Sequence, residues 1–81
     1  MRIEVRLFAQ ARERVGSGLA RLELPDGSRV SDALAVLERT HPGLAELRPH
    51  LAVAVDGALA RTDDVLNANC ELALLPPVSG G

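Results

Sequence analysis

The sequence has few aromatic residues and few cysteines, and each shortage excludes a class of site. Phe8 is the only aromatic residue among 81, and neither tryptophan nor tyrosine occurs. The core must therefore be aliphatic, and no aromatic platform is available on which nucleic-acid bases could stack. Cys70 is the only cysteine, which excludes an internal disulfide bond and a cysteine-based metal cluster. Because Cys70 opens a strand-like stretch, we interpret it as a small packed hydrophobic residue.

Lysine is absent altogether. All nine basic residues are arginines, they are scattered among eleven acidic residues, and the net charge is −2. Because the arginines form no basic stripe, we expect no binding to nucleic acid. Without lysine, no side chain of this protein can accept an isopeptide bond, so an activated carboxyl end would have to react with another molecule.

Long apolar runs are also missing. No run approaches the ~20 apolar residues that cross a bilayer, so no membrane association is expected. Residues 1–4, Met-Arg-Ile-Glu, lack the charged-then-apolar layout of a signal peptide. We therefore expect a cytoplasmic location for a chain whose length suits one small domain.

The sequence offers no convincing metal or phosphate site. His41 and His50 stand beside prolines and have no ligand-spaced partners, so we interpret them as ordinary surface histidines. Residues 16–18, Gly-Ser-Gly, lack the further glycines and the Lys-Ser/Thr of a phosphate loop, and they are typical of a turn. We expect no metal and no cofactor bound by this chain.

Alternating hydrophobicity predicts the strands. In residues 2–7, Ile3, Val5 and Leu7 fall on one side and charged residues on the other. Asp56-Gly57 is a hairpin signal, because both positions favour the backbone of a tight turn. Further strands are predicted at 19–24, 51–55, 58–61 and 70–75.

Two helices are predicted between these strands. Residues 8–15 have helical composition and end at the glycine turn. The main helix has Ser31 as its expected N-cap and Asp32 in its first turn, and it ends before Pro42. Its apolar stripe is formed by Ala33, Leu34 and Leu37. Residues 44–47 could add one further turn.

This order of elements indicates an α+β protein. One main helix packed on one face of a mixed sheet is a compact solution for so short a chain. The order matches a β-grasp, or ubiquitin-like, roll. We expect the β-grasp domain to span residues 1–75, followed by a flexible, extended tail at 76–81 that ends in Gly-Gly.

The last strand predicts a surface for partner proteins. If Leu72 and Leu74 face the main helix, then Ala73 and Leu75 point away from it. Residues 51–55 are likewise apolar on both sides, so the uncovered face exposes an apolar patch that is typical of a protein interface. The alternative is that scattered apolar residues on the surface carry no function. The predicted partner-binding residues are Leu59, Ala73, Leu75, Pro76, Pro77, Val78, Ser79 and Gly80.

The sequence closes with Pro-Pro-Val-Ser-Gly-Gly at residues 76–81. Two glycines without Cβ atoms can pass through a channel that any side chain would block. The prolines disfavour helix, and six extended residues reach at most about 20 Å. We therefore predict that the Gly81 carboxylate is the working group, delivered into another protein's active site. The alternative is an ordinary disordered end.

The chain resembles the small subunit of molybdopterin synthase, the sulfur carrier of molybdenum-cofactor synthesis. The resemblance spans the whole chain and rests on residues 5–13, 53–57 and 71–81, of which the last segment is the most specific. Asp56 stands where the family usually has asparagine, and Asn69-Cys70 stand where it usually has a Gly-Asp turn. Asparagine tolerates a left-handed turn, so the fold is not threatened.

The resemblance implies a carrier mechanism. An adenylating enzyme of the ubiquitin-activating type would use ATP to convert the Gly81 carboxylate into an acyl-adenylate. A sulfur donor protein would then displace AMP and leave a thiocarboxylate. Bound to the large subunit in a heterotetramer, the chain would donate sulfur to cyclic pyranopterin monophosphate and so build the dithiolene. It would not be catalytic alone, because the positive groups that stabilise the reaction would belong to the partner.

Other functions stay open at this stage. The same carrier chemistry could serve thiazole, cysteine or tRNA thiolation, since all of these carriers share the roll and the Gly-Gly end. A β-grasp interaction module whose terminus is never activated is a different class. Conjugation onto lysines of other proteins, as ubiquitin does, is a third.

Overall fold

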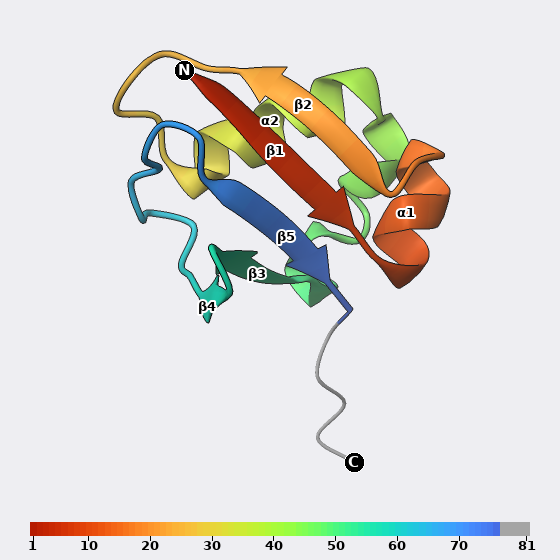
Figure 1. Ribbon diagram of the computed structural model, residues 1–81. Helices are drawn as coiled ribbons and strands as arrows, with labels where there is room; N and C mark the ends of the chain where they lie inside the picture. The colour runs from red at the N-terminus through yellow and green to blue at the C-terminus, as the bar shows by residue number, and fades with distance from the viewer. Residues whose placement is uncertain (77–81) are drawn as a thin grey trace.

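A computed structural model describes residues 1–76 and contains a mixed five-stranded sheet in the order β2-β1-β5-β3-β4 (Figure 1). Strands β1 and β5 are parallel neighbours at the centre, and the other pairings are antiparallel. Helix α2 (Val30–Thr40) lies behind the sheet in Figure 1, and helix α1 (Ala9–Val15) lies beside it, past the end of β1, so that one face of the sheet is covered and one is open. This arrangement confirms the predicted α+β class and the strand order of a β-grasp roll. The strands are β1 Arg2–Leu7, β2 Leu19–Glu23, β3 Ala52–Val55, β4 Ala58–Leu59 and β5 Glu71–Leu75.

The covered face follows directly from the alternating pattern of the central strands. Ile3 and Val5 of β1 are fully buried, as are Leu72 and Leu74 of β5. Since the register places Val5 beside Leu72, aliphatic side chains of adjacent strands form one continuous layer. The predicted inward set on these strands is therefore confirmed.

Helix α1, Ala9–Val15, begins directly after β1. It ends at Gly16, whose φ of +86° places it in the left-handed region and whose N–H donates to the Arg12 carbonyl at 2.8 Å. Glycine adopts this conformation without the steric cost that a Cβ brings, which explains why the helix stops here. The predicted short helix with a glycine end is confirmed.

The main helix α2, Val30–Thr40, packs its apolar stripe on the sheet, but the predicted N-cap is wrong. The cap residue is Arg29 and not Ser31. The Ser31 N–H donates to the Thr62 carbonyl at 2.8 Å, and the Val30 N–H donates to the Asp64 carbonyl at 3.0 Å. A loop distant in sequence therefore satisfies the first turn, so no serine cap is needed.

Two short 3-10 helices link α2 to β3: η1, Pro42–Leu44, and η2, Arg48–His50. The structure thus extends the single turn predicted at 44–47. Leu44 and Leu47 are buried against the core, and the Arg14 side chain of α1 donates to the Gly43 carbonyl at 2.9 Å. These contacts fix the segment that leads into β3.

The hairpin between β3 and β4 forms at Asp56-Gly57, as predicted, with φ values of +49° and +85°. The returning strand is shorter than the predicted 58–61. It comprises only Ala58 and Leu59, although the Ala60 N–H still donates to the Val53 carbonyl at 2.9 Å. Strands β2, β3 and β5 also differ from the predicted bounds by one residue at an end, since pairing with neighbours defines where a ladder stops.

Candidate docking face and C-terminal exit

The open face of the sheet carries an apolar patch built from its last three strands. In the register, Ala54 pairs with Leu59 of β4 and with Ala73 of β5, and Ala52 pairs with Leu75. Residues that pair directly in a sheet project to the same side. The apolar patch therefore consists of Ala52, Ala54, Leu59, Ala73 and Leu75.

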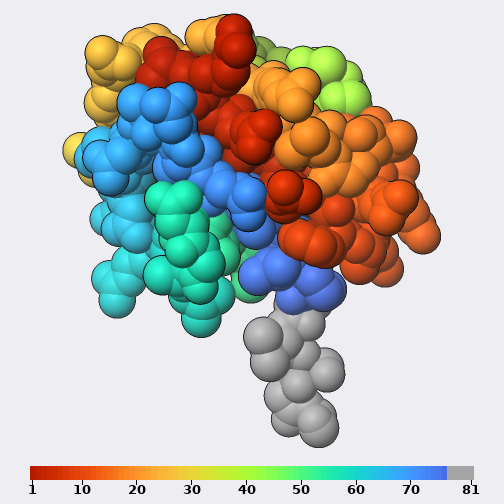
Figure 2. Space-filling view, viewed as in Figure 1, coloured from red at the N-terminus to blue at the C-terminus, as the bar shows by residue number. Residues whose placement is uncertain are grey.

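The centre of the apolar patch is tightly packed and its rim is exposed. Leu59 is 78% exposed, whereas Ala54 is 6% exposed although it lies outside the hydrophobic core cluster. Neighbouring side chains of its own face therefore cover Ala54. Figure 2 views this open face and shows the teal β4 hairpin beside the blue strand β5. Here the structure brings together the predicted residues Leu59, Ala73 and Leu75.

The other half of the open face carries a charged ladder, made of alternating residues on β2, β1 and the start of β5. Each of its ion pairs joins neighbouring strands: Arg2 Nε–Glu23 Oε1 at 3.0 Å, Arg21 Nε–Glu4 Oε2 at 3.4 Å, and Arg6 Nε–Glu71 Oε2 at 3.0 Å. The hydrogen bond that Arg6 donates to Glu71 raises the pKa of Arg6 above its ordinary value, and the charge of the same carboxylate adds to the effect. Such paired, solvated charges resist burial, so a partner protein is better accommodated on the apolar half.

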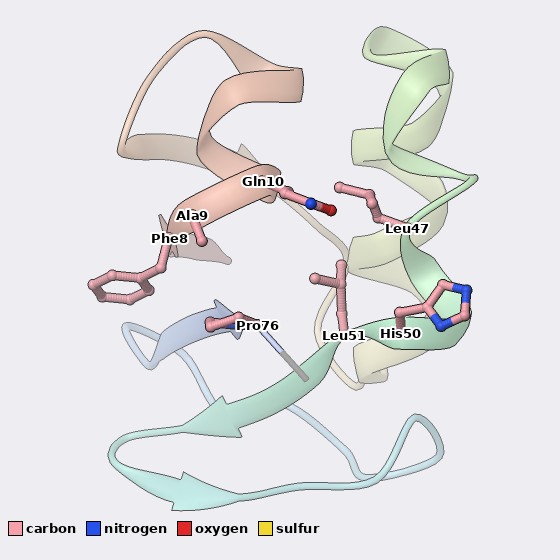
Figure 3. A pocket seen from close by; sticks show the side chains of 7 residues that line it. All are labelled: Phe8, Ala9, Gln10, Leu47, His50, Leu51 and Pro76. Atoms are coloured by element: carbon pink, nitrogen blue, oxygen red, sulfur yellow. The ribbon is translucent and has the colours of Figure 1, made fainter. Parts of the chain in front are cut away.

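A pocket of about 380 Å³ lies beside the point where the chain leaves β5 (Figure 3). Its lining comes from α1, from the segment around η2 and from the first residue after β5. In Figure 3, Gln10 points from α1 toward Leu47, while Leu51 lies between α1 and η2. The lining residues are Phe8, Ala9, Gln10, Leu47, His50, Leu51 and Pro76.

This exit pocket contains features that sequence reasoning missed. Phe8 is 43% exposed, and Ala9 has a φ of +49°, a left-handed conformation that alanine rarely adopts. The signal in the sequence was Phe8 itself, which follows the inward Leu7 and therefore falls out of phase with the core. The two-sided pattern of residues 51–55 places Ala52 and Ala54 opposite the inward side chains, but the predicted site residues do not include them.

The predicted tail residues divide at Pro76. Pro76 is exposed and lines the exit pocket, next to the end of the apolar patch at Leu75. The remaining predicted residues, Pro77, Val78, Ser79, Gly80 and Gly81, lie outside the described residues. Their assignment stays a prediction.

Cys70 occupies the covered side of the sheet, where it is buried. Burial raises the pKa of its thiol, with a smaller contribution from the Asp56 charge. A thiol that is buried and held protonated is a poor nucleophile, so Cys70 serves packing.

His41 and His50 have no ligand partners: among residues 1–76, no group of three or more His, Cys, Asp or Glu could hold a metal ion. Over the same part of the chain, no helix has the length and hydrophobicity needed to cross a membrane.

Comparison with known proteins agrees with this fold. Residues 5–81 match the model of the ThiS family. Small archaeal modifier protein 1 of Haloferax volcanii is 38% identical, over 98% of this chain and 100% of its own. A crystal structure of that organism's SAMP1 covers 100% of both chains with a TM-score of 0.86 and 37% identity. The roll is thus the ubiquitin-like β-grasp, and the chain belongs to the ThiS family.

Two further similarities concern molybdenum-cofactor proteins. The molybdopterin synthase sulfur carrier subunit of Arabidopsis thaliana is 35% identical, over 98% of this chain and 82% of its own. A structure described as a protein–protein complex of subunits 1 and 2 of the molybdopterin-converting factor from Helicobacter pylori contains a similar chain. That chain has a TM-score of 0.68 and 26% identity, with 100% of both chains covered.

Proposed function

We propose that this protein is the sulfur carrier subunit of a molybdopterin synthase, with the Gly81 carboxylate as its working group. The observation that carries the proposal is the position of the apolar patch. It includes Ala73 and Leu75 of β5, the strand that leads directly to residues 76–81, and the family match continues through Gly81. The sulfur carrier subunit of Arabidopsis supports the pathway assignment by its likeness over nearly the whole chain.

The proposed chemistry takes place in two steps at the Gly81 carboxyl group. In the first, a carboxylate oxygen attacks the α-phosphorus of ATP on an adenylating enzyme, and pyrophosphate leaves. In the second, the outer sulfur of a persulfide on the donor protein attacks the acyl carbon, and AMP leaves with the bonding electrons. A thiol then attacks the donor's own sulfur in the resulting acyl disulfide, forming a new disulfide, and the thiocarboxylate leaves with the electrons of the broken S–S bond. The resulting thiocarboxylate is a softer nucleophile than the carboxylate, and it would transfer sulfur to cyclic pyranopterin monophosphate.

The proposed partners are proteins that bind the apolar patch while residues 76–81 extend into their active sites. One is the large subunit of molybdopterin synthase, with which the chain would form a heterotetramer. The Helicobacter complex supports a two-subunit arrangement for a protein of this kind. The adenylating enzyme is the second partner, and the sulfur donor protein is the third. ATP and AMP would be bound by the adenylating enzyme and not by this chain.

The first test is the intact mass of the chain after incubation with ATP, purified adenylating enzyme and a sulfur source. We expect the mass increase that corresponds to one oxygen replaced by sulfur at Gly81. A variant without Gly81, and a variant with one residue appended after it, should stay unmodified while unfolding at the same temperature as the wild type. Normal sulfur loading of either variant would contradict the proposal.

The second test identifies the pathway. The thiocarboxylated chain and the purified large subunit should convert cyclic pyranopterin monophosphate into the dithiolene product. A loaded chain that yields no product here, but supports thiazole formation, cysteine formation or tRNA thiolation with the corresponding enzymes, would assign it to another pathway.

A second candidate function is protein modification, because a relative of 38% identity bears the name of a small archaeal modifier. In that case the activated Gly81 would form an isopeptide bond with a lysine of another protein. Since this chain has no lysine, copies attached to another protein could not be extended into lysine-linked chains. Mass spectrometry of lysine-linked Ser-Gly-Gly remnants on other proteins would distinguish this function.

A further inference from the structure

The boundary between the apolar patch and the charged ladder runs through one residue, Arg6. In the register of β1 and β5, Arg6 stands directly beside Ala73, which belongs to the apolar patch. Because β1 and β5 are parallel and Arg6 is the second-last residue of β1, Arg6 also lies at the end of the sheet from which the chain leaves β5. Arg2 carries the same charge at the opposite end of β1.

The geometry of the ion pair leaves most of the Arg6 guanidinium available. Its Nε donates to Glu71 Oε2 at 3.0 Å, and the Arg6 side chain is 50% exposed. A guanidinium has five N–H donors, four of them on its terminal nitrogens. Within residues 1–76, those terminal nitrogens donate no hydrogen bond to another residue. Glu71 therefore holds Arg6 through Nε alone, which leaves the terminal N–H groups free to donate to another acceptor.

We infer that Arg6 determines specificity at the edge of the apolar patch. Its terminal N–H groups bind a carboxylate on the partner protein that covers the patch. Covering Ala73 removes water from Arg6 beside it, and the donors then need acceptors. A carboxylate matches the fork of N–H groups in a bidentate manner, which a backbone carbonyl cannot do. The partner surface is thus apolar with an acidic side chain at its edge. This inference rests on the proposed docking of the apolar patch.

The competing explanation is that the Arg6–Glu71 pair only stabilises the sheet. Two neutral variants separate the explanations, because Arg6→Gln and Glu71→Gln break the same ion pair. Only Arg6→Gln also removes the contact with the partner. Arg2→Gln is the matched control, since it makes the same change of charge in an equivalent ion pair far from the apolar patch.

The experiment measures the affinity of the full chain for the purified large subunit of molybdopterin synthase and for the adenylating enzyme, both from the same organism. Arg6→Gln should weaken binding to at least one of them by about tenfold, with an effect that shrinks at high salt. Glu71→Gln should weaken binding by less than about threefold, and Arg2→Gln by less than about twofold, as expected for exposed ion pairs. Thermal unfolding of all three variants reports any change of stability.

Two results would overturn the inference: an Arg6→Gln variant that binds both partners within about twofold of wild type, or equal losses for Arg6→Gln and Glu71→Gln. A Leu75→Glu variant separates this failure from a failure of the docking face itself. If Leu75→Glu weakens binding and Arg6→Gln does not, only the role of Arg6 is wrong. If Leu75→Glu binds as wild type does, the apolar patch is not the partner-binding surface, and the inference about Arg6 is wrong as well.

Discussion

The covered and open faces of the sheet are formed by the same strands but carry different kinds of side chain. On the covered face, Ile3, Val5, Leu72 and Leu74 form an unbroken aliphatic layer beneath α2. The open face is divided, with the apolar patch on β3, β4 and the end of β5, and the charged ladder on the remainder. Burying the first layer stabilises the fold, whereas the rim of the apolar patch stays exposed in the free chain. Apolar residues of one strand can therefore lie in the core or on the surface according to their phase.

The largest loss of stability is expected from a substitution on the covered face. Leu72→Ala removes a fully buried side chain at the centre of the sheet and should lower the free energy of unfolding by about 2–5 kcal/mol. Urea denaturation gives this value, with Leu59→Ala as the exposed control. A loss below about 1 kcal/mol for Leu72→Ala would mean that the core relaxes around the cavity.

The next effect belongs to the apolar patch and should appear in binding instead of stability. Leu75→Glu places a charge where a partner removes water, and it should weaken affinity for the large subunit or the adenylating enzyme by about tenfold or more. Thermal unfolding should change little, since Leu75 is only partly buried in the free chain. Unchanged affinity for both proteins would place the interface elsewhere.

A smaller effect is expected at the hairpin that holds Leu59 on the open face. Gly57 has a φ of +85°, and a Cβ built there meets no atom within 4 Å. Gly57→Ala should therefore cost only the backbone strain of a left-handed alanine, about 1–2 kcal/mol. Differential scanning calorimetry measures the change. A loss as large as that of Leu72→Ala would show that the turn contributes more than its own conformation.

The smallest effect is expected from the charged ladder. Glu23→Gln breaks an exposed pair with Arg2 and should change the free energy of unfolding by about 0–1 kcal/mol. The difference from wild type should vanish at high ionic strength, where exposed charges are screened. A large loss that persists in high salt would require a structural role for the ladder beyond its charge pairs.

Sequence patterns predicted the phase of β1 and β5 because burial of one face imposes a strict period of two on the strand. The glycine end of α1 and the hairpin at Asp56-Gly57 were also predictable, since local backbone geometry restricts those positions. The start of α2 was not predictable, because carbonyls of residues 62–64 satisfy its first N–H groups. Nothing in the sequence around Ser31 indicates that contact.

The features of the candidate site likewise divide into those that local sequence predicts and those that depend on distant contacts. Leu59, Ala73 and Leu75 could be assigned outward from strand phase alone, and the structure brings them onto one face. The exit pocket could not be predicted, because it forms where α1, η2 and Pro76 meet from distant parts of the chain. The place of Arg6 at the edge of the apolar patch likewise depended on the pairing of β1 with β5.

By itself, the sequence determined the aliphatic core and the two-sided last strand, because composition and periodicity act along the chain. Only the tertiary structure decided which outward residues became neighbours. Strand order and register are set by long-range packing, and they placed Leu59 beside Ala54 and Arg6 beside Ala73. A surface is made of such neighbours, so its shape and charge are properties of the fold.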